Sequence, residues 1–190
     1  MTPSCLLRTG FQMRRRRALR VALALAVLVA TAFLTESALA SSRSEWSLQP
    51  LNRRVLGAVN RFRAAHGLVA LRDSAELDRS ARQHSLEMGR LGYFGHSSAN
   101  GTVFWRRIRG YYPARGHSYW SVGENLVWAS PNLSAGSAMK LWIRSAPHRA
   151  NLLARQWRQI GISAVAVVQA GGVYGGRRVA IITTDFGVRR

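Results

Sequence analysis

Cysteine is almost absent from this sequence. Cys5 is the only cysteine among the 190 residues, and it precedes a basic and then apolar segment near the N-terminus. The rest of the chain therefore has no disulfide and no cysteine-based metal site. A domain without such cross-links has to be stabilised by the packing of its core.

Acidic residues and lysine are also scarce. The chain has 28 Lys+Arg against 8 Asp+Glu, and Lys140 is its only lysine. Without the six arginines and one glutamate of residues 1–40, 22 basic and 7 acidic residues remain, a formal charge of +15. We interpret this charge as a solvated surface, with attachment to an anionic envelope surface as the alternative. The arginines are scattered and no recognised nucleic-acid module accompanies them, so we do not expect nucleic acid as a partner.

No apolar run in the sequence is long enough to span a membrane. Residues 21–34 are apolar except for Thr31, and these 14 residues fall short of the ~20 that a spanning helix needs. Basic residues 14–17 precede the run, and small residues ending in Ala40 follow it. This order is typical of a secretory signal peptide. We therefore predict cleavage near Ala40 and a secreted, periplasmic or extracellular protein without a membrane span, with an uncleaved anchor as the alternative.

Residues 41–50 are expected to form a polar lead-in to one domain at residues 51–190. A domain of this length can bury roughly two thirds of the surface of its unfolded chain. No internal repeat or low-complexity tract divides it.

The spacing of apolar residues predicts four helices, which begin near residues 50, 74, 103 and 132. The second one has a cap at Asp73 or Ser74 and an end at Gly92 or Gly95. Its buried stripe has 4-3-4-3 spacing and consists of Leu77, Ala81, His84, Met88 and Leu91. We therefore interpret His84 as a core histidine rather than as a ligand.

Alternating apolar residues predict three strands in the second half, at residues 122–128, 159–169 and 173–186. In the first strand Glu124 and Leu126 share one face, and Asn125 lies on the other. The other two form a hairpin around Ala170-Gly171-Gly172. Helices first and a strand pair last predict an α+β domain, with helices packed on a small antiparallel sheet.

Three polar motifs could carry chemistry, and their sequences are Phe94-Gly95-His96-Ser97, Gly123-Glu124-Asn125-Leu126 and Trp142-Ile143-Arg144-Ser145-Ala146-Pro147-His148-Arg149-Ala150-Asn151. They supply two histidines and one carboxylate, His96, Glu124 and His148. Such a set with an open position is a catalytic zinc arrangement, and it could equally share protons as general acid and base. From composition alone, three polar residues that satisfy local backbone groups are the simpler interpretation and rank first.

Common hydrolase motifs are not found around these residues. Ser97 and Ser145 stand near histidines but not in a G-x-S-x-G pattern, so a serine hydrolase is disfavoured. No H-E-x-x-H stretch is present, which argues against a common metalloprotease.

The motifs resemble those of the CAP superfamily, which comprises cysteine-rich secretory, antigen 5 and pathogenesis-related 1 proteins and is also called the SCP domain. Gly123-Glu124-Asn125-Leu126 resembles its glycine-glutamate-asparagine strand. The segment from Trp142 to Asn151 resembles the tryptophan-x-x-serine-x-x-histidine-arginine-x-asparagine segment of the bacterial secreted branch. Phe94-Gly95-His96-Ser97 resembles the first histidine loop, and Thr183-Thr184-Asp185-Phe186-Gly187 also fits. The resemblance covers residues 51–187, with the motifs in the right order.

The resemblance implies an α-β-α sandwich with a central groove. In many members the groove holds two histidines and two glutamates, and some members bind a divalent metal such as zinc there. His96, Glu124 and His148 match three of these four residues. The fourth falls near Ser145, where animal members usually carry glutamate and bacterial members commonly carry serine. With one carboxylate fewer, the site is expected to hold a cation less tightly.

Two classes of function follow from the resemblance. In the first, the protein is a binding module whose groove, with Asn125 and Ser145 beside the three matched residues, takes a lipid, a cell-envelope component or a protein partner. In the second, it is a hydrolase in which His96, Glu124 and His148 bind a metal or activate water to cleave extracellular or cell-wall substrates. No reaction common to the superfamily is established, so the binding module ranks first.

Overall fold

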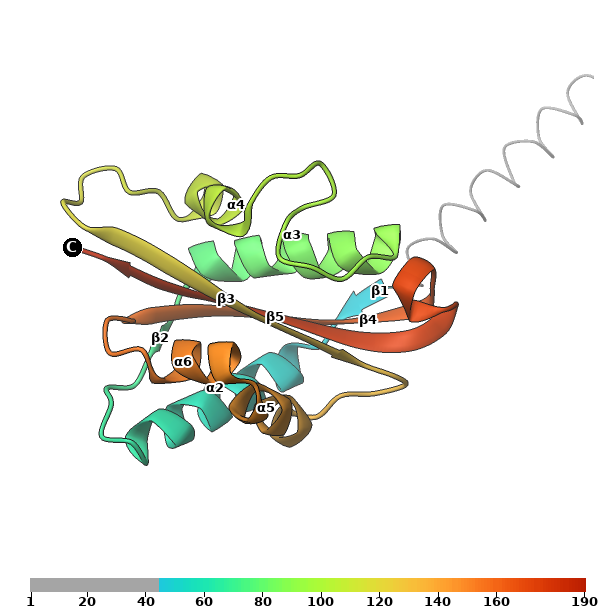
Figure 1. Cartoon of the computed structure of the whole chain (residues 1–190), viewed down its shortest axis with the longest axis horizontal. Coiled ribbons are helices and arrows are strands. Elements are labelled where there is room, and N and C mark those ends of the chain that lie inside the picture. The colour runs from blue at the N-terminus through green and yellow to red at the C-terminus, as the bar shows by residue number, and fades with distance from the viewer. Residues whose placement is uncertain (1–44) are drawn as a thin grey trace, which may run out of the picture. The chain divides into compact units, whose positions relative to one another are not determined.

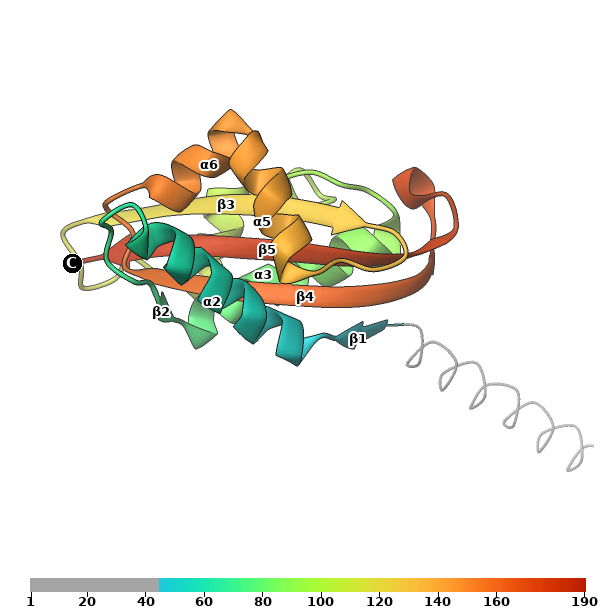
Figure 2. The same ribbon diagram turned by 90° about the horizontal axis from the view of Figure 1, so that it is seen from below.

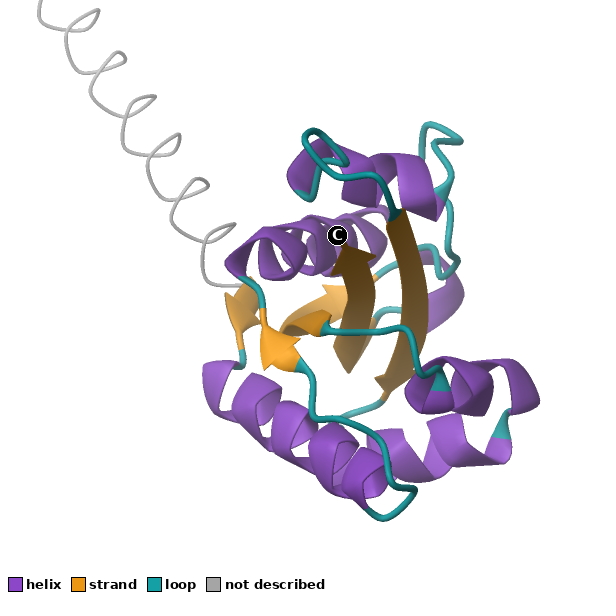
Figure 3. Cartoon of the chain, turned by 90° about the vertical axis from the view of Figure 1, so that its left-hand side faces the viewer, coloured by secondary structure: helices purple, strands orange, loops and turns teal. Residues whose placement is uncertain are grey.

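The computed structural model describes residues 45–190, in which a sheet lies between two layers of helices (Figure 1). The layers consist of α3 (Ala75–Leu91) with α4 (Phe104–Tyr111), and of α2 (Gln49–Ala64) with α5 (Ala135–Arg144) and α6 (Ala146–Leu153). Figure 2 shows α2, α5 and α6 across one face of the sheet, and Figure 3 shows both layers. The predicted α+β sandwich is thereby confirmed. Within residues 45–190, no helix has the length and apolar character needed to cross a membrane, and the predicted signal peptide lies outside these residues.

The sheet is built around a long hairpin of β4 (Gln159–Ala170) and β5 (Arg177–Arg189). The strand order is β1-β4-β5-β3, with β1 (Glu45–Ser47) and β3 (Trp120–Ala129) at the edges. These pairs are antiparallel, and the short β2 (Arg72–Asp73) adds a parallel pairing to β4.

The register places Asp185 of β5 between Glu124 of β3 and Gly161 of β4. Residues directly opposite each other in an antiparallel pair project from the same face of the sheet. The carboxyl groups of Glu124 and Asp185 are therefore neighbours on one face.

The alternation along β3 divides its side chains between the two helix layers, as predicted. Leu126 belongs to a core cluster with Met88 of α3, whereas Val127 belongs to the larger cluster with Val55 of α2 and Ala138 of α5. Glu124, two residues from Leu126, therefore faces α3 and α4, and Asn125 faces the layer of α2, α5 and α6.

The predicted boundaries of α3 are confirmed, but one residue of its predicted stripe is wrong. The helix begins after Ser74, whose hydroxyl accepts a hydrogen bond from the Leu77 N–H, and it ends at Gly92 with a φ of 70°. Leu91 is 62% exposed, although the other four stripe residues are fully buried. Leu91 is the last residue of the helix, and the next residue, Gly92, lies with its backbone against the backbone of Gly171 and Gly172.

Other elements also differ from the prediction. The second hairpin strand begins at Arg177 rather than at residue 173, because Gly172–Tyr174 form a 3₁₀ helix that leaves Val173 57% exposed. Helix α6 was not predicted, since Leu152 is its only buried residue and no apolar stripe marks it. Strand β1 lies within the expected polar lead-in and has only three residues.

Candidate functional site

Glu124 is the buried centre of a polar cluster at the β3 edge of the sheet. Its side chain is not exposed to solvent, and each carboxylate oxygen has a partner. Oε1 lies 2.7 Å from Nδ1 of His96, and Oε2 forms an ion pair with Nη2 of Arg107. The structure therefore brings together His96 and Glu124 from separate segments. The His96 side chain is 52% exposed, and its other ring nitrogen, Nε2, remains for an external group.

Arg107 is a site residue that the sequence analysis missed. It lies on α4 and is 6% exposed, and its Nη1 donates hydrogen bonds to the His96 carbonyl oxygen at 3.0 Å and to Ser98 Oγ at 3.4 Å. Arg107 thus holds both the carboxylate of Glu124 and the loop that carries His96. A sequence signal existed, because Arg107 lies one helical turn after Phe104 and next to Ile108 on the inner side of α4.

His148 reaches the same edge of the sheet from the opposite helix layer, on α6. The Asn125 side-chain amide donates to the His148 carbonyl oxygen at 3.0 Å. The Asn151 amide donates to the Glu124 carbonyl oxygen and to Asn125 Oδ1, both at 3.0 Å. Asn125 and Asn151 therefore fasten α6 to the edge strand on which Glu124 lies.

The His148 imidazole is half-buried and electrostatically coupled to His96. Burial, and then the charge of His96, lowers the pKa of His148 below its ordinary value. The ring is therefore neutral near pH 7 and can accept a proton. His96 contacts Glu124 on the α3 and α4 side of β3, whereas α6, which carries His148, lies in the other helix layer.

Asp185 is a second buried carboxyl that the sequence analysis did not select. It is fully buried beside Glu124, and neither carboxyl oxygen has a hydrogen-bond partner. Burial, and then the charge of Glu124, raises the pKa of Asp185 well above its ordinary value, while Arg107 acts in the opposite direction. Its surroundings therefore favour the neutral form of Asp185 beside the charged pair. In the sequence, Asp185 is part of the segment Thr183-Thr184-Asp185-Phe186-Gly187, which supported only the family resemblance. Its position beside Glu124 follows from the pairing of β3 with β5.

The remaining predicted residues have more local surroundings. Ser145 is half-buried in the turn between α5 and α6, and its side chain caps neither helix. No hydrogen bond joins it to His96, Glu124 or His148 within the described part of the chain. His84 is fully buried, and its Nε2 lies 2.8 Å from the Gly95 carbonyl oxygen. It therefore positions the loop before His96.

A zinc centre would need Glu124 to offer a free oxygen. Both oxygens are engaged, and the Arg107 guanidinium would lie beside any cation held there. Among residues 45–190, no group of three or more His, Cys, Asp or Glu side chains is arranged to hold a metal ion. The arrangement therefore does not fit a centre of two histidines and one glutamate, and leaves His96 Nε2 and His148 as the available donors.

Known proteins share this sequence pattern. The model of the cysteine-rich secretory protein family, CAP, matches residues 56–175. YkwD of Bacillus subtilis (strain 168), described as an uncharacterized protein, is 28% identical over 128 residues, which span 67% of this chain and 46% of the relative. The chain therefore spans about half the length of this curated relative.

Solved structures share the fold. An outer surface protein of Borrelia burgdorferi has a TM-score of 0.64 at 16% identity, covering 77% of this chain and 98% of that protein. An extracellular protein of Bacillus anthracis (strain Ames) that contains an SCP domain has a TM-score of 0.57 at 24% identity, and the match covers 75% of this chain and 41% of that protein. A cysteine-rich secretory protein of Staphylococcus aureus has a TM-score of 0.51 at 15% identity, and the match covers 73% of this chain and 38% of that protein. With the family match over more than half of its residues, the chain belongs to the cysteine-rich secretory protein family, CAP.

Proposed function

We propose that this protein is exported and acts as a binding module whose surface around His96 and His148 takes a lipid-like or other cell-envelope ligand. The predicted signal peptide supports export. So do the names of the relatives, which describe an outer surface protein, an extracellular protein and a secretory protein.

The observation that carries the proposal is the saturation of Glu124. Both of its oxygens are bonded to side chains, and the carboxylate has no contact with solvent. Such a group acts as a fixed support for His96 and α4 rather than as a reacting group. The exposed side of His96 is then free to bind the polar end of a ligand.

Exposed apolar side chains lie near His96. Phe94 is two residues before it in the sequence, and Val103 and Trp105 flank Phe104, whose ring lies close to His96. Phe94 is 39% exposed, Val103 37% and Trp105 40%, and the ring centres of Phe104 and His96 are 6.1 Å apart. Aromatic side chains beside a polar group suit a molecule with an apolar body and a polar end. The proposed ligand is therefore amphipathic.

Two tryptophans allow a matched test. Trp105 and Trp46 are 40% and 37% exposed, and each has an arginine 5.3 Å above its ring, Arg106 and Arg178 respectively. Trp46 lies on β1, at the opposite edge of the sheet from β3. Titration with a fluorescent long-chain fatty acid should show binding that Trp105→Ser weakens about tenfold, whereas Trp46→Ser should bind like the wild type.

Three further measurements complete the experiment. Thermal unfolding of each variant shows whether it is folded, and His96→Gln should also weaken binding. Mass spectrometry of solvent extracts from the natively purified protein identifies the natural ligand. Equal weakening in both tryptophan variants, or no saturable binding, would overturn the proposal.

Hydrolysis is the second candidate, because a buried carboxylate orients His96 and His148 is neutral near pH 7. An imidazole oriented in this way suits activation of a water molecule. Isolated peptidoglycan and unstructured peptides are suitable substrates. In a hydrolase of this kind, Glu124→Gln should lower the rate about 10²-fold or more, and the rate should fall as acid protonates His148. Absence of turnover above the buffer control would eliminate this candidate.

Zinc is tested separately with protein purified without a histidine tag. Because the available donors are His96 Nε2 and His148, we expect weak binding that does not survive dialysis. His148→Ala should abolish it. A stoichiometric metal that remains after dialysis would show that Glu124 exchanges Arg107 for the cation.

A further inference from the structure

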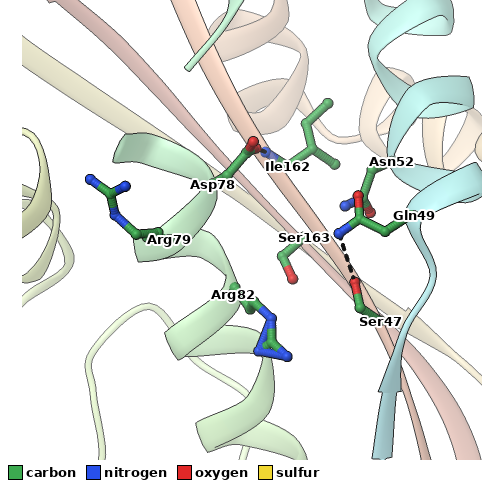
Figure 4. Close-up of a pocket in the computed structure, with 8 residues that line it drawn as sticks. All are labelled: Ser47, Gln49, Asn52, Asp78, Arg79, Arg82, Ile162 and Ser163. Carbon is green, nitrogen blue, oxygen red and sulfur yellow. Dashed lines mark hydrogen bonds between the residues drawn. The ribbon is translucent and has the colours of Figure 1, made fainter. Parts of the chain in front are cut away.

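A small cleft lies at the edge of the sheet opposite the His96 site, where β1 leads into α2 (Figure 4). Its volume is about 90 Å³, and α3 and β4 form its other walls. The lining residues are Ser47, Gln49, Asn52, Asp78, Arg79, Arg82, Ile162 and Ser163. This volume suits a small polar group.

Ser163 is a buried hydroxyl that lines the cleft without a partner. The residue is 2% exposed, and its Oγ makes no hydrogen bond. A buried hydroxyl without a hydrogen bond is costly, so such groups usually have a partner. In Figure 4 the hydroxyl points into the cleft, and a bound molecule would supply the missing bond.

Two further donors on the cleft wall are oriented by bonds on their other side. Asn52 Oδ1 accepts a hydrogen bond from the Ala164 N–H at 2.8 Å, which leaves the Asn52 NH₂ group to donate. Ser47 Oγ accepts from Gln49 Nε2 at 3.1 Å, which leaves the Ser47 hydroxyl hydrogen to donate. In both side chains the oxygen accepts a hydrogen bond within the protein. The Asn52 NH₂ group and the Ser47 hydroxyl hydrogen therefore remain to donate to a bound group.

The positive charge at the cleft is not engaged in an ion pair within residues 45–190, although the Asp78 carboxyl lines the same cleft. Helix α2 begins there with no side-chain cap and no acidic residue in its first turn, so the positive end of its dipole is uncompensated. Arg82 makes no hydrogen bond or ion pair with residues 45–190. Figure 4 shows the Arg82 guanidinium on the same side as the Ser163 hydroxyl, whereas the Arg79 side chain points away.

We propose that this cleft is a binding site for a phosphate group, held by the Arg82 guanidinium, the hydroxyls of Ser47 and Ser163 and the Asn52 amide. Arginine and hydroxyl donors match the oxygens of a tetrahedral oxyanion, and several convergent donors are needed to desolvate one. A planar carboxylate offers only two oxygens and would leave donors unpaired. The site is separate from His96, so it does not depend on the function proposed above.

Asp78 makes the site sensitive to pH. Its Oδ1 accepts a hydrogen bond from the Ile162 N–H at 2.7 Å, and burial raises its pKa to about 6, with a smaller contribution from Asp73. The charged groups that face it are Asp73, Arg79 and Arg82, and the other lining residues are neutral. Above this pH the Asp78 carboxylate repels an anion, and below it the neutral acid does not.

Isothermal titration of the purified protein with inorganic phosphate tests the site. We expect saturable binding that Arg82→Gln weakens about tenfold or more. Ser163→Ala should weaken it several-fold with little effect on folding. Arg79→Gln is the matched comparison, since it removes the same charge from the same helix but from a side chain that points away from the Ser163 hydroxyl, so it should weaken binding much less than Arg82→Gln does. Asp78→Asn keeps an acceptor for the Ile162 N–H and should strengthen binding at neutral pH.

Titration with sulfate separates the pH effect from the protonation of phosphate itself. Sulfate affinity should rise as the pH falls through about 6, and Asp78→Asn should remove that rise. Cosedimentation with phosphatidylglycerol vesicles that depends on Arg82 much more than on Arg79 would assign the phosphate to a lipid headgroup. Phosphate binding without vesicle binding would assign it to a soluble phosphate. Equal effects of Arg79→Gln and Arg82→Gln, or no saturable binding, would overturn the proposal.

Discussion

Two side chains of different chemistry hold the carboxylate of Glu124, the permanent cation Arg107 and the titratable imidazole of His96. All of the Glu124 side chain and nearly all of the Arg107 side chain are buried. A buried ion pair adds little net stability, because both charges lose their hydration. Losing one partner is far more costly, since it leaves an uncompensated charge in the interior.

Arg107→Met should therefore destabilise the protein by about 3–5 kcal/mol, measured by urea unfolding at neutral pH. The exposed Arg106 on the same helix provides the control, and Arg106→Met should cost less than about 1 kcal/mol. Adding Glu124→Leu to Arg107→Met should recover part of the loss, because the unpaired charge is then gone. A similar small loss for both arginine variants would contradict the buried ion pair.

Asp185 predicts a pH dependence with a defined sign. Its pKa is raised in the folded protein, so the folded state binds its proton more tightly than the unfolded state. This contribution to stability is complete below the unfolded pKa of about 4 and is lost as the pH rises toward the folded pKa. In the Asp185→Asn variant this side chain is an amide and does not titrate. Relative to the wild type, the variant should gain free energy of unfolding as the pH rises from about 4 to about 8.

Urea unfolding of the wild type and of Asp185→Asn at several pH values, under otherwise identical conditions, measures this difference. A difference between wild type and Asp185→Asn that does not change with pH would show that Asp185 is ionised throughout.

The candidate site was only partly predictable from single residues. The polar motifs identified His96 and Glu124, which the structure brings into contact. Arg107 is one of 28 basic residues, and nothing in its residue type distinguishes a buried arginine from the many on the surface. Asp185 was hidden for a different reason, since its neighbour Glu124 is 61 positions away and the pairing depends on strand register.

At the scale of elements, the packing of α3 on β4 depends on Gly161. A Cβ atom at this position would lie 2.1 Å from the Leu77 carbonyl carbon and 2.2 Å from the Asp78 nitrogen, both backbone atoms of α3. The helix therefore rests directly on the strand. This helix is capped by Ser74 and carries His84, which contacts the loop before His96, and Asp78, which lines the cleft. The distance between α3 and the sheet therefore affects the position of residues at both candidate sites.

Gly161→Ala should move α3 away from β4 and destabilise the protein by about 3 kcal/mol or more. Gly110→Ala on α4 is the control, because no atom lies within 4 Å of the added Cβ and alanine favours a helix by about 1 kcal/mol. Urea unfolding measures both variants. Comparable stability for Gly161→Ala and wild type would contradict the close contact of helix and strand.

Elements with a strong apolar period were predicted well, and short ones were not. The stripe of α3 and the alternation of β3 each bury several residues, so the pattern is visible in the sequence. Helix α6 buries only Leu152 and is stabilised by contacts with β3, including the Asn151 amide. Strand β1 exists only because β4 offers it a partner. Tertiary contacts of this kind leave no local signal.

At the scale of the whole molecule, the positive charge acts against folding. Residues 41–190 carry a formal +15, and compaction brings these charges together. Salt shortens the range of the repulsion, from about 30 Å at 0.01 M to about 8 Å at 0.15 M ionic strength. The Tm at neutral pH should therefore rise between these two concentrations of sodium chloride.

A neutral osmolyte at matched osmolality controls for solute exclusion and should raise the Tm less than the salt does. A Tm that falls with salt would mean that partly exposed ion pairs such as that of Arg189 and Glu76 outweigh the general repulsion.

The position of β5 between β4 and β3 has a consequence for when the protein folds. It is the last of the described elements in chain order, and within residues 45–190 it is the only strand that pairs with β3. While the ribosome is still making this segment, β3 has no partner and the sheet stays open. The sheet therefore stays incomplete until late in synthesis, and an incompletely folded chain is the form that can pass through a narrow membrane channel. Under the export that we propose, this order of the strands would delay completion of the sheet until after translocation.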